Sequence, residues 1–153
     1  MATTSQVPTF VRLGNMLTRT LLRTGFKLAG PGNIPMYLLT VRGRKSGQPR
    51  TTPIVVVEQD GKRYLVAPFG AVDWVRNLRA AGVATLTRGR RTEAIRAKEL
   101  PRDEASLVLQ RSVEHGRIPS FLAKYFEVTA QSSPQQLEEA AARHPVFLLQ
   151  SPA

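Results

Sequence analysis

An Asp-Gly pair between two apolar runs constrains the fold of this chain more than any other feature. Asp60-Gly61 follows residues 53–58, with the sequence PIVVVE, and precedes residues 63–67, with the sequence RYLVA. An Asp-Gly pair flanked by such runs is a strong signal for a tight hairpin turn. The two runs are therefore predicted to pair as antiparallel strands.

The rest of the chain adds four short strands and several helices. A strand over residues 36–41 is expected to lead into a loop over residues 42–52, and Gly89-Arg90-Arg91 is expected to turn a second hairpin. Helices are predicted over residues 72–80, 101–113, 120–126 and from Ser133-Pro134 to residue 142, where proline takes the first helical position. The strands outside the Asp-Gly hairpin are predicted over residues 36–41, 83–87, 92–98 and 145–149. The economical architecture is an α+β fold, a small antiparallel barrel of about six strands with flanking helices.

Residues 9–29 form a different kind of segment. Leucines recur near helical spacing while Arg12, Arg19, Arg23 and Lys27 occupy another side, which predicts a basic amphipathic helix that ends at residues 30–33. Such a helix can lie on an anionic membrane, and it can equally pack its apolar side on the domain. We expect an N-terminal helical segment over residues 1–30 and one barrel domain over residues 31–153.

The charge of the chain is strongly one-sided. The net charge is +11, and eight basic residues precede the first acidic residue, Glu58. This surplus predicts an anionic partner, although it can also be a solubilising surface. The sequence has no helix-turn-helix motif, RNP-like strand or zinc finger, so nucleic acid is not expected as a partner.

The residues that are missing exclude several chemistries. There is no cysteine, which removes disulfides, thiolate metal sites and cysteine nucleophiles, and the two histidines lack metal-ligand spacing, so no metal site is expected. No apolar run approaches the roughly 20 residues that span a bilayer. The first residues lack the pattern of a secretion signal, so we expect a cytoplasmic protein.

Residues 42–53, with the sequence RGRKSGQPRTTP, are the most informative loop. Its glycines allow backbone amides to turn toward a ligand, its hydroxyls add donors, and its cations can meet on one anion cluster. Binding of phosphate or carboxylate is the physical interpretation. The spacing alone also fits a solvated basic hairpin.

A second informative stretch surrounds the single tryptophan. Trp74 and Asn77 lie three residues apart in the predicted helix, so the indole could stack on a planar ring while the amide bonds to its edge. Alternatively Trp74 and Leu78, four residues apart, are both core contacts.

Taken in order, these motifs resemble the deazaflavin-dependent nitroreductases, a family of small actinobacterial split-β-barrel oxidoreductases. The resemblance rests on GRKSGQPR, TTP, the Asp-Gly hairpin, YLVA and the Trp-x-x-Asn-Leu helix, and covers about residues 34–98. It implies a split barrel that uses reduced coenzyme F-420, a deazaflavin with a phosphodiester and a polyglutamate tail. FMN, with one phosphate, would make less use of so basic a loop.

The resemblance also implies the site residues. Those expected to contact the coenzyme are Arg44, Lys45, Ser46, Gly47, Gln48 and Arg50 in the tail-binding loop, Thr52 and Pro53 beside the ring, and Trp74 and Asn77 on the helix that packs on it. The coenzyme supplies the hydride chemistry and the protein orients it, so no carboxylate pair or catalytic triad is needed.

Two departures from the family concern the acceptor. Pro68-Phe69 stands where relatives carry a Ser-Lys pair, and Phe121 stands where a tyrosine is common, although Tyr125 is close by and is our candidate catalytic group. Phe69, Phe121 and Tyr125 are therefore expected to line an apolar pocket for a quinone, an enone, a nitro compound or an unsaturated lipid. The alternative is a non-catalytic barrel that carries a lipid or fatty acid.

Overall fold

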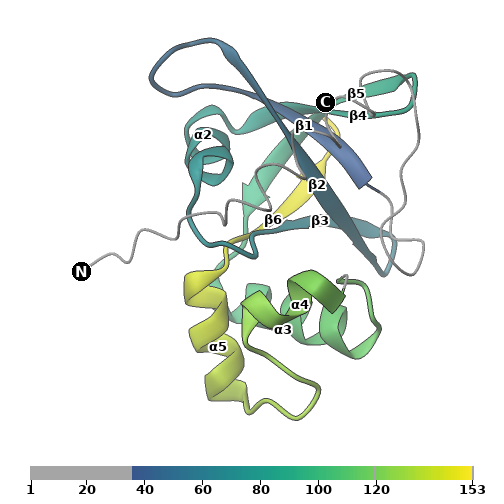
Figure 1. Cartoon of the computed structure of the whole chain (residues 1–153), viewed down its shortest axis with the longest axis vertical. Helices are drawn as coiled ribbons and strands as arrows, with labels where there is room; N and C mark the ends of the chain where they lie inside the picture. Colours follow the sequence, from purple (N-terminus) through teal and green to yellow (C-terminus); the bar gives the residue numbers. More distant parts are fainter. Residues whose placement is uncertain (1–35, 119, 153) are drawn as a thin grey trace.

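The computed structural model describes residues 36–118 and 120–152 of the 153-residue chain (Figure 1). The predicted helix over residues 9–29, the turn at 30–33 and the N-terminal segment 1–30 lie outside the described residues. The elements are, in chain order, β1 (Met36–Arg42), β2 (Pro49–Gln59), β3 (Lys62–Val66), α2 (Asp73–Ala81), β4 (Val83–Arg88), β5 (Arg91–Glu99), α3 (Arg102–Glu114), α4 (Ser120–Phe126), α5 (Pro134–Arg143) and β6 (Val146–Gln150).

The strands close into a barrel in the order β1-β2-β3-β6-β5-β4, and every neighbouring pair is antiparallel. The barrel closes because β1 pairs with β2 on one side and with β4 on the other, where Leu38 faces Thr87. The predicted antiparallel barrel with flanking helices is confirmed.

Both predicted hairpins form, and each has a two-residue turn. Asp60 and Gly61 connect β2 to β3 with φ angles of 51° and 75°, the left-handed pair that a type I′ turn requires. Arg88 faces Arg91 across the second turn, where Gly89 has a φ of 61°. The backbone twist of such turns matches that of the strands, which fixes the register of both hairpins.

Alternate residues of the strands fill the barrel. In β2, β3 and β6 the side chains of Val56, Leu65 and Phe147 point inward and belong to the barrel core. Helix α2 lies against this core through Val75 and Leu78, both almost completely buried.

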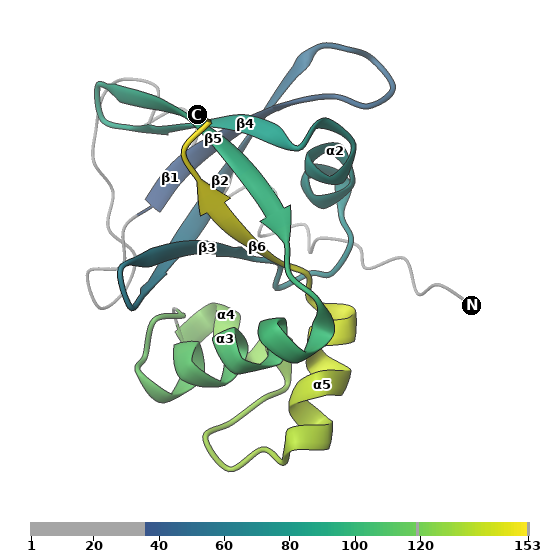
Figure 2. The same cartoon turned by 180° about the vertical axis from the view of Figure 1, so that it is seen from behind.

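Helices α3, α4 and α5 lie together on one side of the barrel, next to β3 and β6, as Figures 1 and 2 show from opposite sides. The neighbouring strand residues Val57, Val66 and Val146 point outward and join this helical layer in a second core. Successive side chains of a strand point to opposite faces, so the same strands serve both cores. No helix in the described residues combines the length and the apolar character needed to cross a membrane.

The predicted loop over residues 42–52 is wrong, because strand β2 begins at Pro49 rather than Pro53. The pairing of β1 with β2 continues without a break from Met36 opposite Val55 to Arg42 opposite Pro49. Among the described strands, β3 pairs with β2 only beyond Val55, so Pro53 has a strand on one side alone. A strand with one open side tolerates prolines. The loop therefore shrinks to residues 43–48.

Candidate functional site

The loop over residues 43–48 is closed by its own hydrogen bonds. The amide of Gly43 donates to the carbonyl of Gln48 at 2.8 Å, and the amide of Gly47 donates to the carbonyl of Gly43 at 2.9 Å. The hydroxyl of Ser46 accepts from the amide of Gln48 at 3.2 Å. Gly47 has a φ of 70°, a conformation that favours glycine. The loop is thus a structured projection at the end of β1 and β2.

Gly43 is predicted to tolerate no side chain. A Cβ atom at this position would lie 2.6 Å from the Ser46 hydroxyl oxygen and 3.2 Å from the Gln48 carbonyl oxygen. We expect Gly43→Ala to lower the free energy of unfolding by about 1–3 kcal/mol, the usual cost of overpacking. Urea denaturation measures this loss. Adding Ser46→Ala removes the closest clashing atom and should restore part of the stability; equal stability of Gly43→Ala and wild type would contradict the prediction.

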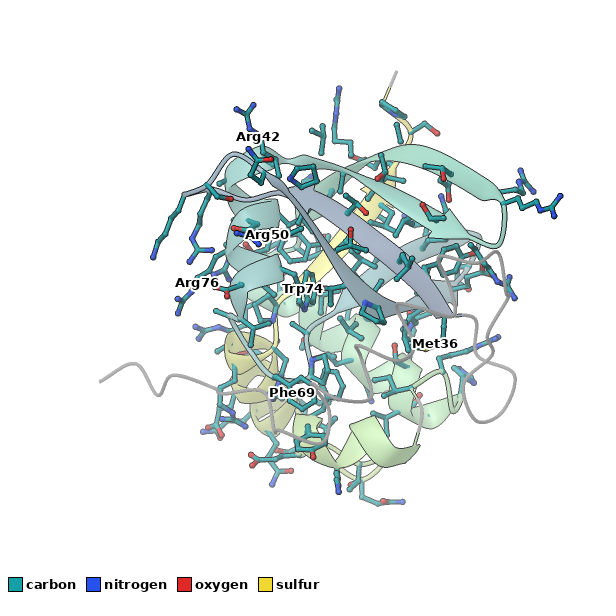
Figure 3. The ribbon with its side chains drawn as sticks, turned by 45° about the horizontal axis from the view of Figure 1, so that its top comes forward. Met36, Arg42, Arg50, Phe69, Trp74 and Arg76 are labelled. Carbon is teal, nitrogen blue, oxygen red and sulfur yellow. The ribbon has the colours of Figure 1, made fainter. Side chains whose placement is uncertain are left out.

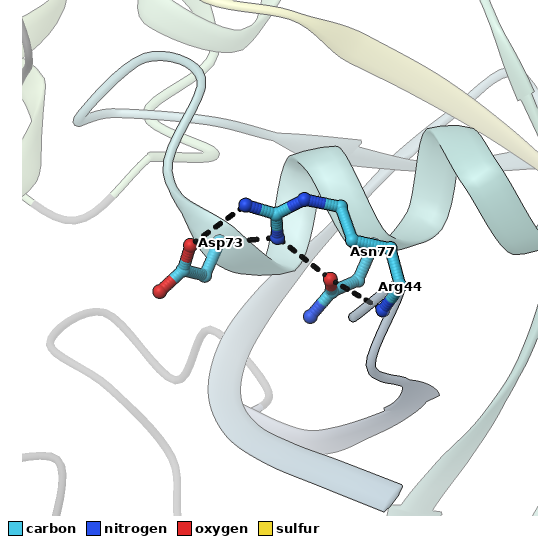
Figure 4. Close-up of polar contacts among 3 residues, drawn as sticks. All are labelled: Arg44, Asp73 and Asn77. Carbon is cyan, nitrogen blue, oxygen red and sulfur yellow. Dashed lines mark hydrogen bonds and ion pairs between the residues drawn. The ribbon is translucent and has the colours of Figure 1, made fainter. Parts of the chain in front are cut away.

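Arg44 ties the loop to helix α2. Its backbone amide and its Nη1 both donate to the side-chain oxygen of Asn77, at 3.1 Å and 2.8 Å (Figure 4). The guanidinium also lies 3.4 Å from a carboxylate oxygen of Asp73. Asn77 is 4% exposed, whereas the Asp73 side chain is 86% exposed. The bonds to Asn77 therefore hold the loop, and the exposed ion pair adds little.

The structure thus brings together the two motifs that the sequence singled out, although 33 residues separate them. The roles predicted for Arg44 and Asn77 as direct coenzyme contacts stay predictions. What the contacts show is that each is the other's partner. Their shared geometry gives the basic loop a fixed position beside α2.

Other cations around this loop have no hydrogen-bond or ion-pair partner among the described residues. Lys45 and Arg50 are exposed, and within residues 36–118 and 120–152 neither makes an ion pair or a side-chain hydrogen bond. Arg42 extends toward Gly47: a Cβ atom added at Gly47 would lie 3.5 Å from the Nη2 of Arg42. Figure 3 shows Arg42, Arg50 and Arg76 on the same side of the molecule as Trp74. This group of cations can attract an anion without breaking an ion pair between described residues.

Arg42 and Arg76 were not among the predicted site residues. Arg42 is the last residue of β1, directly before the loop, and Arg76 precedes Asn77 in α2. Both positions are exposed. Their position within or next to the two motifs is a signal that could have found them.

Trp74 lies between the barrel core and the surface. Its indole packs on the core cluster, with its centroid 6.1 Å from that of Phe147, yet the residue stays partly exposed. Leu78 is 1% exposed. The core interpretation therefore holds fully for Leu78 and in part for Trp74, which keeps some of its surface available. Thr52 and Pro53 are half-buried on β2, opposite Leu39 and Leu38.

The residues predicted to line the acceptor pocket come from two separate segments. Phe69, in the link between β3 and α2, meets the ring of Tyr125 from α4 edge to face, with the centroids 4.8 Å apart. The amine of Lys124 lies 5.2 Å from the centre of the Tyr125 ring. The backbone of Phe121 belongs to α4, and its side chain lies outside the described part of the structure. Phe69 and Tyr125 therefore form one aromatic pair.

Within the described residues, no three His, Cys, Asp or Glu side chains gather as a metal site would require. His144 is 7% exposed, and its Nδ1 lies 2.9 Å from the carbonyl oxygen of Ala67. Burial lowers the pKa of His144, with a smaller opposing effect of the Ala67 carbonyl.

This closed antiparallel barrel, with a basic hairpin loop held against a tryptophan-bearing helix, is similar in fold to a solved F420-H2 dependent reductase. Residues 14–133 match the F420H₂-dependent quinone reductase family. The chain belongs to this family. It is an oxidoreductase that depends on coenzyme F-420, which confirms the predicted family, enzyme class and cofactor.

Solved structures support the same assignment. An "F420-H2 Dependent Reductase (FDR-A)" is 26% identical, with a TM-score of 0.53 over 82% of this chain and 98% of that chain. A "domain-swapped dimer" is also 26% identical, with a TM-score of 0.55 over 92% and 97%. The heme storage protein HutZ of Vibrio cholerae, 13% identical with a TM-score of 0.53 over 77% and 82%, shares the fold alone.

The residues present fit the coenzyme. Its phosphodiester and polyglutamate tail is a polyanion. Lys45 in the loop and Arg50 at the start of β2 have no carboxylate partner in the described chain. Charge-assisted bonds from such cations to phosphate or carboxylate are the strong class of hydrogen bond. An anionic tail therefore supplies what the loop lacks.

Proposed function

We propose that this chain reduces an electron-poor, apolar acceptor with coenzyme F-420, and that a quinone is the acceptor class it suits best. The reduced coenzyme supplies a hydride. The observation that carries the proposal is the state of the basic loop and of Arg50 beside it. Lys45 and Arg50 are exposed and unpaired in the described chain, and Asn77 fixes the position of the loop against the tryptophan helix.

The basic loop is proposed to hold the coenzyme tail. Lys45 and Arg50 attract the anionic groups, while Ser46, Gly47 and Gln48 shape the turn between them. Arg44 contributes through its bonds to Asn77, because its own guanidinium is already engaged. Since the loop is closed before the coenzyme arrives, little ordering is left to occur on binding, which favours affinity.

The ring end of the coenzyme is proposed to lie beside Trp74, Thr52 and Pro53. The partly exposed indole offers a flat apolar surface on which a planar ring can stack. The half-buried strand residues shield the ring from water. Excluding water protects a reduced coenzyme from side reactions.

The acceptor is proposed to meet the aromatic pair of Phe69 and Tyr125, with Phe121 on the same helix as Tyr125. An aromatic wall favours a flat apolar ring such as that of a quinone. The Tyr125 hydroxyl is our candidate for a proton donor to the reduced acceptor. Residues 9–29, outside the described part, are our candidate for peripheral contact with an anionic membrane, where apolar quinones reside.

Titration with the coenzyme tests this function. We expect the purified chain to quench the fluorescence of coenzyme F-420 at micromolar concentrations, and to oxidise its reduced form when menadione is added. Mass spectrometry of extracted ligands is the companion measurement. A stoichiometric bound lipid with neither coenzyme binding nor turnover would favour the lipid carrier and reject the reductase.

A further inference from the structure

His144 occupies the point where three segments of the structure meet. It caps the end of α5, and Pro145 alone separates it from β6. Its Nδ1 lies 2.9 Å from the carbonyl oxygen of Ala67, and its ring lies 4.9 Å from that of Phe126 in α4. The amide of Ala67 in turn donates to the carbonyl of Pro145 at 3.1 Å. Ala67 is therefore bound through both its amide and its carbonyl.

Ala67 begins the link that leads to the proposed site. Its carbonyl also accepts from the amide of Gly70 at 3.3 Å, and the carbonyl of Gly70 accepts from the amide of Val72 at 2.9 Å. Val72 is the residue from which α2 starts. A continuous path of hydrogen bonds thus runs from His144 to the start of the helix that carries Trp74.

His144 also contacts α4, the helix that carries Tyr125, the second member of the aromatic pair. Phe69, within the link, contacts Tyr125, and the next residue of α4, Phe126, is fully buried against the His144 ring. One side chain thus touches both segments that hold the pair: the link by a hydrogen bond and α4 by ring packing.

We propose that His144 is a positioning residue that sets the geometry of the Phe69–Tyr125 pair and of Trp74. This inference rests on the proposed function for what the pair does, namely receive the acceptor. His144 itself touches neither coenzyme nor acceptor. Its function is to donate from Nδ1 to the Ala67 carbonyl, which can only accept, so the neutral ring carries its proton on Nδ1.

The surroundings of the ring favour this neutral form. Burial lowers the pKa of His144 from its ordinary value of 6.5, and the nearby Arg143 acts in the same direction. The Ala67 carbonyl and, more weakly, Glu127 oppose them. The ring therefore stays neutral near pH 7 and keeps one defined donor.

Paired substitutions test the role. Asparagine places its amide nitrogen at the same position along the side chain as Nδ1, so His144→Asn keeps the donor, whereas His144→Phe keeps a ring and removes it. We expect His144→Phe to raise the KM for menadione about fivefold or more, with the coenzyme Kd changed less than twofold. His144→Asn keeps the donor but loses the ring packing on Phe126, so its KM should rise less than that of His144→Phe. Its coenzyme Kd should stay within about twofold of wild type.

Trp74 is the only tryptophan, so its emission reports on the start of α2 without any ligand. Acrylamide quenching of Trp74 should at least double in His144→Phe and stay near the wild-type value in His144→Asn. If His144→Phe fails to fold, His144→Gln replaces it, because the glutamine amide nitrogen lies one bond further out than Nδ1. The Gln variant should then show the KM and the Trp74 quenching expected for His144→Phe.

Several results would overturn the proposal. Unchanged Trp74 quenching and an unchanged KM in His144→Phe would do so. So would a folded His144→Asn variant whose KM and Trp74 quenching rise as much as those of His144→Phe. If wild type binds no coenzyme, the proposed function fails, and the Trp74 measurement still decides whether His144 positions α2.

A pH series gives an independent readout. Because the folded-state pKa of His144 lies below 6.5, the unfolded chain takes up the proton first as the pH falls. The stability of wild type relative to His144→Asn should be constant above pH 6.5 and fall below it. A difference that stays flat down to pH 5 would contradict a buried neutral ring at this position.

Discussion

The double variant Lys45→Glu/Arg50→Glu is expected to bind coenzyme F-420 at least about 100-fold more weakly than wild type. Each charge-assisted hydrogen bond contributes roughly 1.5–3 kcal/mol, and a tenfold change in affinity corresponds to about 1.4 kcal/mol. Losing two such bonds accounts for this factor, and the reversed charges add repulsion. Both side chains are exposed, so the fold should be unaffected.

Fluorescence titration at several salt concentrations measures this effect. Because the lost contacts are ionic, the gap between wild type and variant should narrow as salt rises. The matched control is Lys62→Glu/Arg90→Glu, which changes the net charge equally at exposed positions away from the basic loop. Lys62 is the first residue of β3, and Arg90 lies in the turn between β4 and β5. If both double variants lose the same affinity, general charge attraction explains binding and the proposed tail site is wrong.

Asn77→Ala is expected to lower the free energy of unfolding by roughly 2–3 kcal/mol, because two donors of Arg44 lose their shared acceptor. The loss is not larger since water can reach part of the Arg44 side chain, which is 23% exposed. The coenzyme Kd should rise as well, because the loop is no longer held beside α2. Urea denaturation and fluorescence titration measure the two effects.

Asn77→Asp separates the acceptor from the rest of the side chain. The carboxylate keeps an oxygen for the Arg44 amide and guanidinium, so this variant should retain most of the stability that the alanine variant loses. The attraction between the new carboxylate and Arg44 offsets its burial. Equal destabilisation of both variants would show that packing of the amide, and not its bonds to Arg44, holds the loop.

Local sequence signals predicted most of the fold. The Asp-Gly pair specified its turn because both residues adopt left-handed angles, and Ser133 begins α5 with the reciprocal bonds to Gln136 that a capping box requires. The start of β2 was missed for a physical reason. Pro49 and Pro53 lower the preference of this stretch for a strand, although its threonines favour one. Its pairing with β1 decided the outcome.

The candidate site was predicted in its parts but not in its connections. The basic loop and the tryptophan helix were each visible as patterns. The bond of Arg44 to Asn77 joins residues 33 positions apart, and the bond of His144 to Ala67 joins residues 77 apart. Such contacts depend on barrel closure, which no local pattern encodes. The positions of Arg42 and Arg76 on one side of the molecule likewise depend on how β1 and α2 lie in the closed barrel.

The position of β6 has a consequence for how the molecule reaches its native state. This strand lies between β3 and β5, so residues 63–66 must find residues 146–149 before the barrel closes, with α3, α4 and α5 folded in between. Contacts this distant along the chain slow folding, because the entropy of closing a long loop is lost before the strands pair. The seam between β3 and β6 should thus form late in refolding, after the two local hairpins, and its rate should limit the recovery of activity.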